Sequence, residues 1–187
     1  MLKTTHSILL MNIEYIKKYI PNIELSYDFV NHNKVYDLFI AVPFGKKYII
    51  WFTYFNHNNV CILIQVNHKT QELLSFEIIT VAYNQLLMGT IIYGTIVHYN
   101  DIKYFLTENI IYYRNEYVNK KSFNNKLNLL ENVFSNINNN IYTTYQTIIG
   151  SCIMNTNKEK LIESLRFLNY NIFCILSKNT TNNCTRI

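Results

Sequence analysis

Two lysines beside a turn glycine are the residues best placed for chemistry on a phosphate group. Lys46 and Lys47 follow the run Pro43-Phe44-Gly45, which is typical of a tight turn between strands. Their ammonium groups can contact a phosphate from such a turn, or one of them can act as a displaced nucleophile. We favour a basic turn in solvent over a nucleophilic lysine. Whether either lysine contacts a phosphate stays open from the sequence.

A carboxylate and an amide form the second candidate group. Glu108 and Asn109 lie side by side in a segment with strong β propensity. Neighbours on a strand point to opposite faces, so only one of the two can line a cleft. A lone carboxylate binds Mg²⁺ poorly without phosphate oxygens to complete the octahedron. We therefore expect Glu108 on a solvated face and predict no metal site.

Histidines and aromatic residues offer weaker candidates. The histidines in or near turns, His57, His68 and His98, lack the spacing of metal ligands, so we expect them at the surface. The aromatic run at residues 51–55 can provide a stacking surface for bases, or it can pack in the core. Alternation puts only half of these rings on either face, and we favour the core.

Composition excludes several classes of protein. The chain has 187 residues, of which 49% are hydrophobic, and its 17 Lys+Arg against 12 Asp+Glu give a net charge of +5. The lysines come as scattered pairs, whereas a dedicated nucleic-acid stripe is denser, so we expect most of them in solvent. With 4 glycines, neither a GxGxxG fingerprint nor a Walker A loop is present.

Location and redox state follow from what the pattern lacks. No segment reaches the roughly 18 to 20 apolar residues that a membrane helix needs, and residues 1–14 do not read as a signal peptide. The four cysteines are far apart in the sequence. We therefore expect reduced thiols, no membrane partner and a cytoplasmic protein. Without repeats or a linker, residues 1–187 are predicted to form a single domain.

Hydrophobic periodicity and turn residues predict an α+β fold with largely antiparallel sheets and a few packed helices. Residues 36–66 read as an antiparallel meander, and Asn100-Asp101 joins strands at 91–99 and 103–113. Ser122 opens a helix with one apolar face. The further expected elements are a helix at 7–19, strands at 24–30, 75–79, 142–154 and 170–176, a helix at 157–168, and a frayed tail at 177–187.

Two stretches resemble the nucleotidyltransferase domain of mRNA capping enzymes and nucleic-acid ligases. Residues 41–52 look like the strand-turn-strand that bears the KxDGxR signature of that superfamily. Residues 92–97 and 104–113 look like its "DGELV" and "FDILYYNG" strands, and the helix with Lys126 fits the helix that follows. The order and spacing of these motifs match the family over roughly residues 24–135. The motif sequences are similar to those of small capping-enzyme-like proteins of giant DNA viruses. The resemblance implies a nucleotidyltransferase (ATP-grasp-like ligase/capping) architecture.

The resemblance also implies a chemistry whose groups this sequence lacks. In the family a lysine amine attacks the α-phosphate of ATP or GTP, and carboxylates hold a divalent metal. Gly45 and Gly94 keep the family's turn glycines, and Lys47 takes the arginine position. The family's lysine, aspartate, glutamate and second aspartate are replaced, in that order, by Val42, Phe44, Thr95 and Asn109. The C-terminal KxK strand has no clear match, so we expect no catalytic residue.

The resemblance therefore favours a catalytically degenerate capping-enzyme-like domain. Such a domain binds a nucleotide or RNA through Gly45, Lys46, Lys47 and Gly94, or supports a viral capping or transcription assembly in the host cytoplasm or a viral factory. Mg²⁺ and GTP or ATP are implied only if nucleotide binding remains. Two alternatives stay open: a structural or interaction protein that reuses the fold, and an active guanylyltransferase with a displaced lysine.

Overall fold

The computed structural model describes residues 12–20, 36–55, 57–67, 69–70, 72–138 and 147–180. The helices are α2 (Ile13–Tyr19), α3 (Phe123–Ser135), α4 (Lys158–Leu165) and the 3₁₀ turn η1 (Gln85–Leu87). The strands are β1 (Leu38–Pro43), β2 (Lys47–Phe55), β3 (Asn58–Val66), β4 (Leu73–Ile79), β5 (Ala82–Tyr83), β6 (Ile91–Tyr99), β7 (Ile102–Tyr113), β8 (Glu116–Tyr117), β9 (Ile137–Asn138), β10 (Thr147–Ser151), β11 (Met154–Asn155) and β12 (Ile172–Lys178). The predicted mixed α+β class with mostly antiparallel strands is confirmed.

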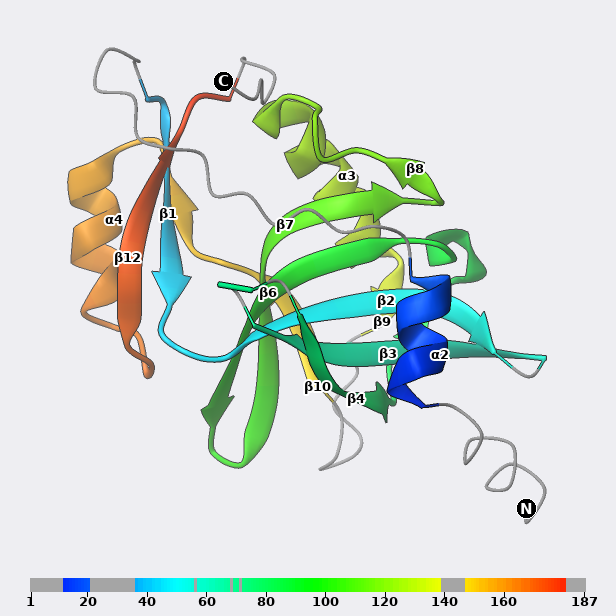
Figure 1. The fold of residues 1–187 in the computed structure, drawn as a ribbon. Coiled ribbons are helices and arrows are strands. Elements are labelled where there is room, and N and C mark those ends of the chain that lie inside the picture. Colours follow the sequence, from blue (N-terminus) through cyan, green and yellow to red (C-terminus); the bar gives the residue numbers. More distant parts are fainter. Residues whose placement is uncertain are drawn as a thin grey trace.

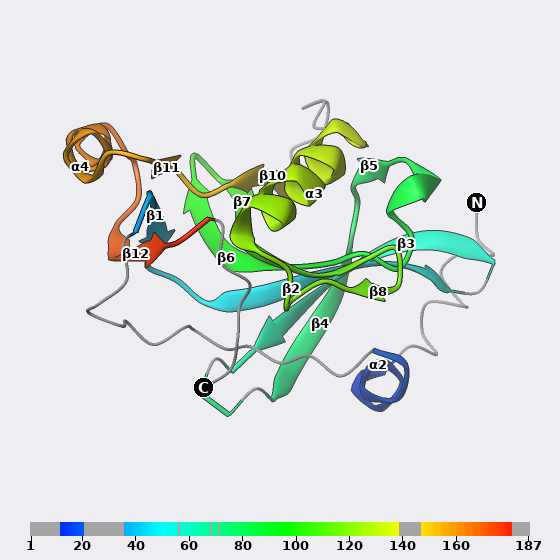
Figure 2. The ribbon, with the colours of Figure 1, turned by 90° about the horizontal axis from the view of Figure 1, so that it is seen from above.

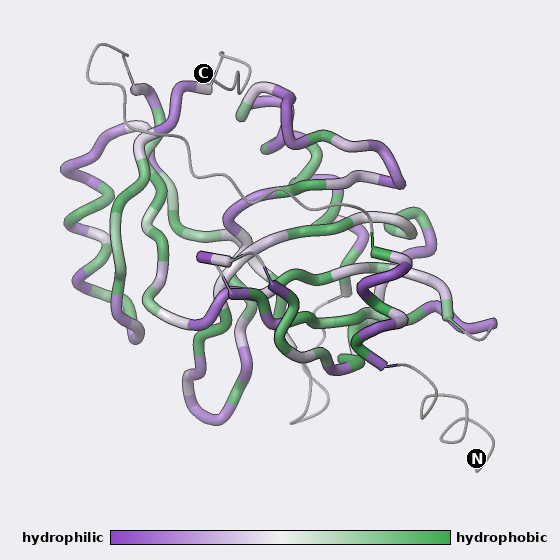
Figure 3. The backbone as a smooth tube through the Cα atoms, viewed as in Figure 1, coloured by the Kyte–Doolittle hydropathy of each residue, from purple (hydrophilic) through white to green (hydrophobic). Residues whose placement is uncertain are grey.

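A seven-stranded sheet forms the centre of the molecule. Its order is β10-β7-β6-β2-β3-β4, with β8 paired to β7, and all pairings are antiparallel except β10 with β7. Helix α3 covers one face and α2 the other (Figures 1 and 2), so a core lies on each side. Hydrophobic residues run along these strands, whereas the β6–β7 turn and much of α4 are hydrophilic (Figure 3).

A second sheet, β11-β1-β12, lies at one end of the first and carries α4 on its outer side (Figures 1 and 2). The predicted meander over 36–66 is therefore wrong at its first strand. Strands β2 and β3 do form a hairpin, but β1 pairs with C-terminal strands on both of its edges. Val42 lies opposite Cys174, and Ile40 lies opposite Met154. These partners are more than a hundred residues away in the sequence, so no local sequence pattern predicts the pairing.

Elements with strong local signals lie where the sequence predicts them. Strands β6 and β7 form the expected hairpin, and Asn100 and Asp101 at its turn have φ angles of 48° and 60°. Asparagine and aspartate tolerate this left-handed conformation better than most residues. Ser122 is the N-cap of α3, because its hydroxyl accepts a hydrogen bond from the Asn125 amide. Residues 13–19 and 158–165 are helical, as expected.

Other expectations are corrected or lie outside the described residues. The strand expected over 142–154 is two strands, β10 and β11, separated by Cys152 and Ile153, and its first residues are among 139–146, which the structure does not describe. The expected strand at 24–30 and residues 7–11 also lie outside. The tail is not frayed at its start, since Ser177 and Lys178 belong to β12 and pair with β1.

Thr180 ties the end of β12 to the start of β1. Its backbone amide and its hydroxyl donate hydrogen bonds of 2.8 and 2.6 Å to the Asp37 carboxylate. The hydroxyl bond is the main reason that the pKa of Asp37 lies below its usual value of 3.8. A lowered carboxyl pKa stabilises the fold above the pKa of the unfolded chain, and this contribution is lost as the pH falls through the folded value.

Replacing Thr180 with alanine is therefore expected to raise the pKa of Asp37 toward 3.8, because the hydroxyl donor is removed. An NMR titration of the Asp37 carboxyl measures the change. Thr180→Ala is also expected to be less stable than the wild type at neutral pH, where the contribution of the lowered pKa is fully present, and this difference shrinks as the pH falls through the folded pKa of Asp37. The Thr156→Ala variant, which alters an exposed threonine elsewhere, leaves the titration unchanged. An unshifted Asp37 in Thr180→Ala contradicts this assignment.

Candidate functional site

The two turn glycines of the sequence analysis lie on either side of one threonine. Gly45 follows β1 and passes so close to β6 that a Cβ there would lie 2.7 Å from Thr95 Cγ2 and 2.8 Å from the Ile96 carbonyl oxygen. Gly94 directly precedes Thr95, and a Cβ there would overlap the carbonyl oxygen of Leu106 on β7. Both glycines are therefore required by close backbone packing, whatever the site binds.

Lys47, Thr95 and Glu108 form a buried hydrogen-bonded group, called here the lysine cluster. Lys47 Nζ donates to Glu108 Oε1 and to Thr95 Oγ1, each at 2.6 Å, and the Thr95 hydroxyl donates to the same Glu108 oxygen. The side chains of Lys47 and Glu108 are 10% and 4% exposed. The predictions of Lys47 in a solvated turn and of Glu108 on a solvated strand face are therefore both wrong, whereas Lys46 is exposed as expected.

Strand register explains how three distant residues meet. Lys47 on β2 pairs with Thr95 on β6, and Thr95 pairs with Leu106 on β7, two residues before Glu108. On β7 the register then shifts, because Tyr93 lies opposite Asn109 while Gly94 lies opposite Thr107. Glu108 is the extra residue of this β-bulge, a feature that re-aims side chains. The bulge interrupts the alternation along β7, so counting along the strand could not tell which face Glu108 lies on.

The lysine cluster lies where the two sheets meet. Cys152, which precedes β11, and Cys174 on β12 come close enough to the Lys47–Glu108 pair to be affected by its charges. Burial raises the pKa of the Cys152 thiol. The negative charge of Glu108 raises this pKa further, and the positive charge of Lys47 lowers it. Burial also raises the pKa of Cys174. Both are free thiols, as is Cys61, and they stay protonated at neutral pH; Cys184 lies outside the described residues.

The positions to which the resemblance assigned degenerate catalytic groups differ in their surroundings. Val42 is buried in β1, with 1% of its surface exposed, whereas Phe44 is 68% exposed. The aromatic run of β2 packs in the core except for Tyr54. His57 and His98 are exposed, as predicted, and His68 lies outside the described residues.

A second buried polar group, which the sequence analysis missed, lies next to the bulge. The side-chain oxygen of Asn119 accepts hydrogen bonds from Asn109 Nδ2 and from Lys126 Nζ, both at 3.1 Å. Lys126 is only 3% exposed. Its spacing from Phe123, Leu130 and Val133 puts it on the buried stripe of α3, and that spacing was the available signal. The amide of Asn109 is thus engaged within the protein.

The donors at the lysine cluster do not fit a divalent cation. Glu108 is its single carboxylate, one oxygen of which is occupied by Lys47 and Thr95. Its other oxygen, Oε2, is buried with no hydrogen-bond partner and can accept from one further donor. Among the described residues no three or more histidine, cysteine, aspartate or glutamate side chains gather as metal ligands would. Mg²⁺ needs near-octahedral oxygen ligation, which a lone ion-paired carboxylate does not supply.

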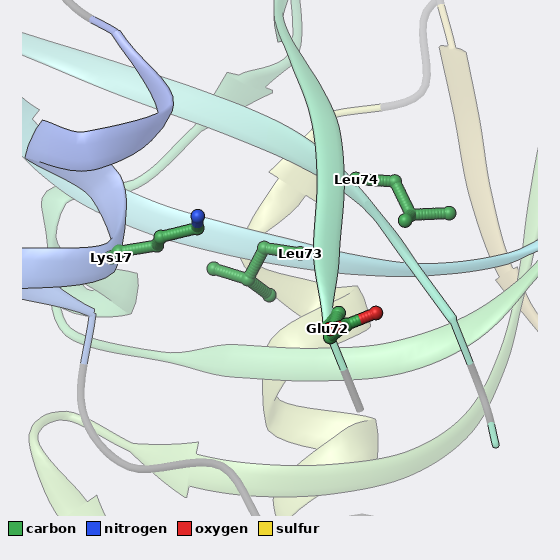
Figure 4. A pocket seen from close by; sticks show the side chains of 4 residues that line it. All are labelled: Lys17, Glu72, Leu73 and Leu74. Atoms are coloured by element: carbon green, nitrogen blue, oxygen red, sulfur yellow. The ribbon is translucent and has the colours of Figure 1, made fainter. Parts of the chain in front are cut away.

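A pocket lies between α2 and the start of β4. It is lined by Lys17, Glu72, Leu73 and Leu74 (Figure 4). Lys17 also donates to Glu14 at 3.0 Å. The pocket contains neither of the two turn glycines nor any residue of the lysine cluster, and its opposite charges favour no particular ligand.

The fold and the site define an α+β protein with a lysine–glutamate pair buried where two sheets meet. No protein-family model and no curated protein sequence matches this chain. Across the described residues, no helix is both long enough and apolar enough to cross a membrane. The function is therefore argued from the residues themselves.

Proposed function

We propose that the chain is a nucleotidyltransferase-like domain without nucleotidyl-transfer activity, which acts by binding in an assembly that handles nucleotides or RNA. The lysine cluster is the observation that carries this proposal. A lysine nucleophile must bring a free amine to the α-phosphate. The Lys47 nitrogen is instead buried between a carboxylate and a hydroxyl oxygen, at 2.6 Å from each.

The packing of the turn glycines supports the same proposal. The resemblance rests on Gly45 and Gly94; Gly45 lies against Thr95, and Gly94, which precedes Thr95 in the chain, lies against Leu106. A non-catalytic homologue would keep the tight backbone packing at the two glycines. An ion pair would take the place of the catalytic groups. With Val42 in the lysine position and one paired carboxylate nearby, neither a nucleophile nor a metal site is available there.

The proposal predicts that the protein forms no covalent lysyl-nucleotide. Purified protein is incubated with GTP or ATP labelled at the α-phosphate, with Mg²⁺ or Mn²⁺, and then run on a denaturing gel. We expect no labelled band, because Lys47 is sequestered and the metal ligands are missing. An active capping enzyme in a parallel reaction shows that the conditions support labelling.

Two lysine variants identify the nucleophile if a band does appear. A label that is lost in Lys46→Ala would assign the chemistry to the exposed lysine and establish the guanylyltransferase alternative. A label lost in Lys47→Ala would mean that the ion pair opens in solution, provided that this variant still unfolds cooperatively. Either result overturns the non-catalytic proposal.

A further inference from the structure

Three phenylalanines stand exposed at one end of the three-stranded sheet, and they are called here the phenylalanine platform. Phe44, Phe167 and Phe173 are 68%, 85% and 68% exposed. They follow the end of β1, follow the end of α4 and lie near the start of β12, and Figure 1 shows these three ends at the same end of the second sheet. Large hydrophobic side chains gathered on a surface mark an interaction site rather than chance exposure.

Backbone hydrogen bonds hold the main chain at two of these phenylalanines. The Phe44 amide donates a hydrogen bond of 2.8 Å to the Asn171 carbonyl, which joins the turn after β1 to the segment before β12. The rings of Phe44 and Phe173 have centroids 6.4 Å apart and planes inclined by 43°. The Phe167 amide bonds to the Ser164 carbonyl at the end of α4. A main chain fixed in this way does not have to be ordered when a partner binds.

Two cations lie beside the platform, and the carboxylate nearest to it in the sequence is the exposed Glu163, four residues before Phe167. Lys46 and Arg166, both exposed, lie two residues from Phe44 and one residue from Phe167 respectively. Residues 38–55 and 164–180 contain no aspartate or glutamate. The exposed amides of Asn169 and Asn171 lie in the same connection and can both donate and accept. Aromatic faces with cations and amides beside them suit a partner that has flat rings and negative charges.

We propose that the phenylalanine platform binds single-stranded nucleic acid. Unstacked bases lie on the phenylalanine rings, while Lys46 and Arg166 contact the phosphates between them. Stacking makes such binding tolerant of sequence, and the phosphate contacts make it weaken with salt. The inference rests on the binding role proposed above and names the partner and the surface.

Fluorescence anisotropy with labelled single strands of about twelve nucleotides tests the platform directly. We expect Phe44→Ala and Phe173→Ala each to weaken binding about tenfold, the effect of removing one stacked base. Lys46→Ala and Arg166→Ala are expected each to reduce the slope of log K against log salt by about 0.7, one phosphate contact on a single strand. RNA and DNA of the same sequence are compared, and RNA preference would indicate contacts to the 2′-hydroxyl.

Matched variants away from the platform provide the controls. Tyr54 is an exposed aromatic residue, 55% accessible, near the far end of β2, and Lys120 is an exposed lysine after β8. Tyr54→Ala and Lys120→Ala are expected to bind as the wild type does. Because the platform side chains are exposed, their alanine variants should keep the wild-type melting temperature, which circular dichroism checks.

Three results would overturn the assignment: no binding of single strands by the wild type, equal affinity in the platform variants, or preference for a duplex. A protein partner that binds the wild type but not Phe44→Ala, without any oligonucleotide binding, would make the platform a protein interface instead. The nucleotide-labelling assay separates the two proposals. A blank gel with no oligonucleotide binding removes the platform and leaves the non-catalytic proposal, whereas a labelled band removes the latter.

Discussion

Glu108→Leu is expected to lower the free energy of unfolding by about 3–5 kcal/mol, the range for removing one partner of a buried ion pair. The variant leaves the Lys47 ammonium in a site where its side chain is 10% exposed and only the Thr95 hydroxyl remains as an acceptor. Urea denaturation followed by circular dichroism measures the loss. The loss of stability comes mainly from leaving the Lys47 charge buried without a partner, and less from losing its attraction to Glu108.

A double variant and a surface pair distinguish this explanation from a general loss of packing. Lys47→Met combined with Glu108→Leu removes both charges, and we expect it to recover most of the stability, because hydrophobic replacement of a buried pair is often close to neutral. Glu116→Leu breaks the pair with Lys121, whose side chains are 62% and 38% exposed, and should cost less than about 1 kcal/mol. A Glu108→Leu loss as small as that of Glu116→Leu would mean that Lys47 reaches water.

Gly94→Ala is expected to cost about 3 kcal/mol, or to prevent folding. A Cβ at this position would overlap the carbonyl oxygen of Leu106, which is backbone in the middle of the β6–β7 ladder and cannot rotate away as a side chain could. Overpacking of a well-ordered site typically costs about 1–3 kcal/mol, and the rigidity of the obstacle puts this position at the upper end. Thermal unfolding and soluble yield together report the effect.

Gly150 supplies the matched control within the same sheet. It lies on β10, and a Cβ there meets no atom within 4 Å. Gly150→Ala should therefore be neutral or slightly stabilising, by up to about 1 kcal/mol, since alanine restricts the unfolded chain. Equal stabilities of the Gly94 and Gly150 variants would show that the bulge relaxes easily, and the packing explanation for Gly94 would then fail.

The sequence predicted those parts of the fold whose causes are local. The β6–β7 hairpin follows from Asn100 and Asp101, which accept positive φ, and the start of α3 follows from the Ser122 cap. Strands β2, β3 and β4 were found from their composition alone. In each case the residues that determine the structure lie within a few positions of it.

The lysine cluster could not be predicted in the same way. Lys47 and Glu108 are 61 residues apart, and the bulge that sets off Glu108 from strict alternation has no signature in the sequence around it. Gly45 and Gly94 do lie at neighbouring places, Gly45 against Thr95 and Gly94 against Leu106, and phosphate contact at them stays a prediction. The burial of Lys126 was missed as well, although its helical spacing from Leu130 was an available signal.

The pairing of β1 has a consequence for how the chain acquires its structure. This strand, at residues 38–43, is the central member of its sheet, yet both of its partners lie after residue 153. During synthesis it must wait, with both edges unsatisfied, until nearly the whole chain has emerged from the ribosome. Contacts between residues so far apart in the sequence slow folding. Until they form, the unpaired edges of β1 are exposed and prone to aggregation. The seven-stranded sheet is built mostly from neighbouring hairpins and can form earlier. Strand β1 can pack against it before its own partner strands are made.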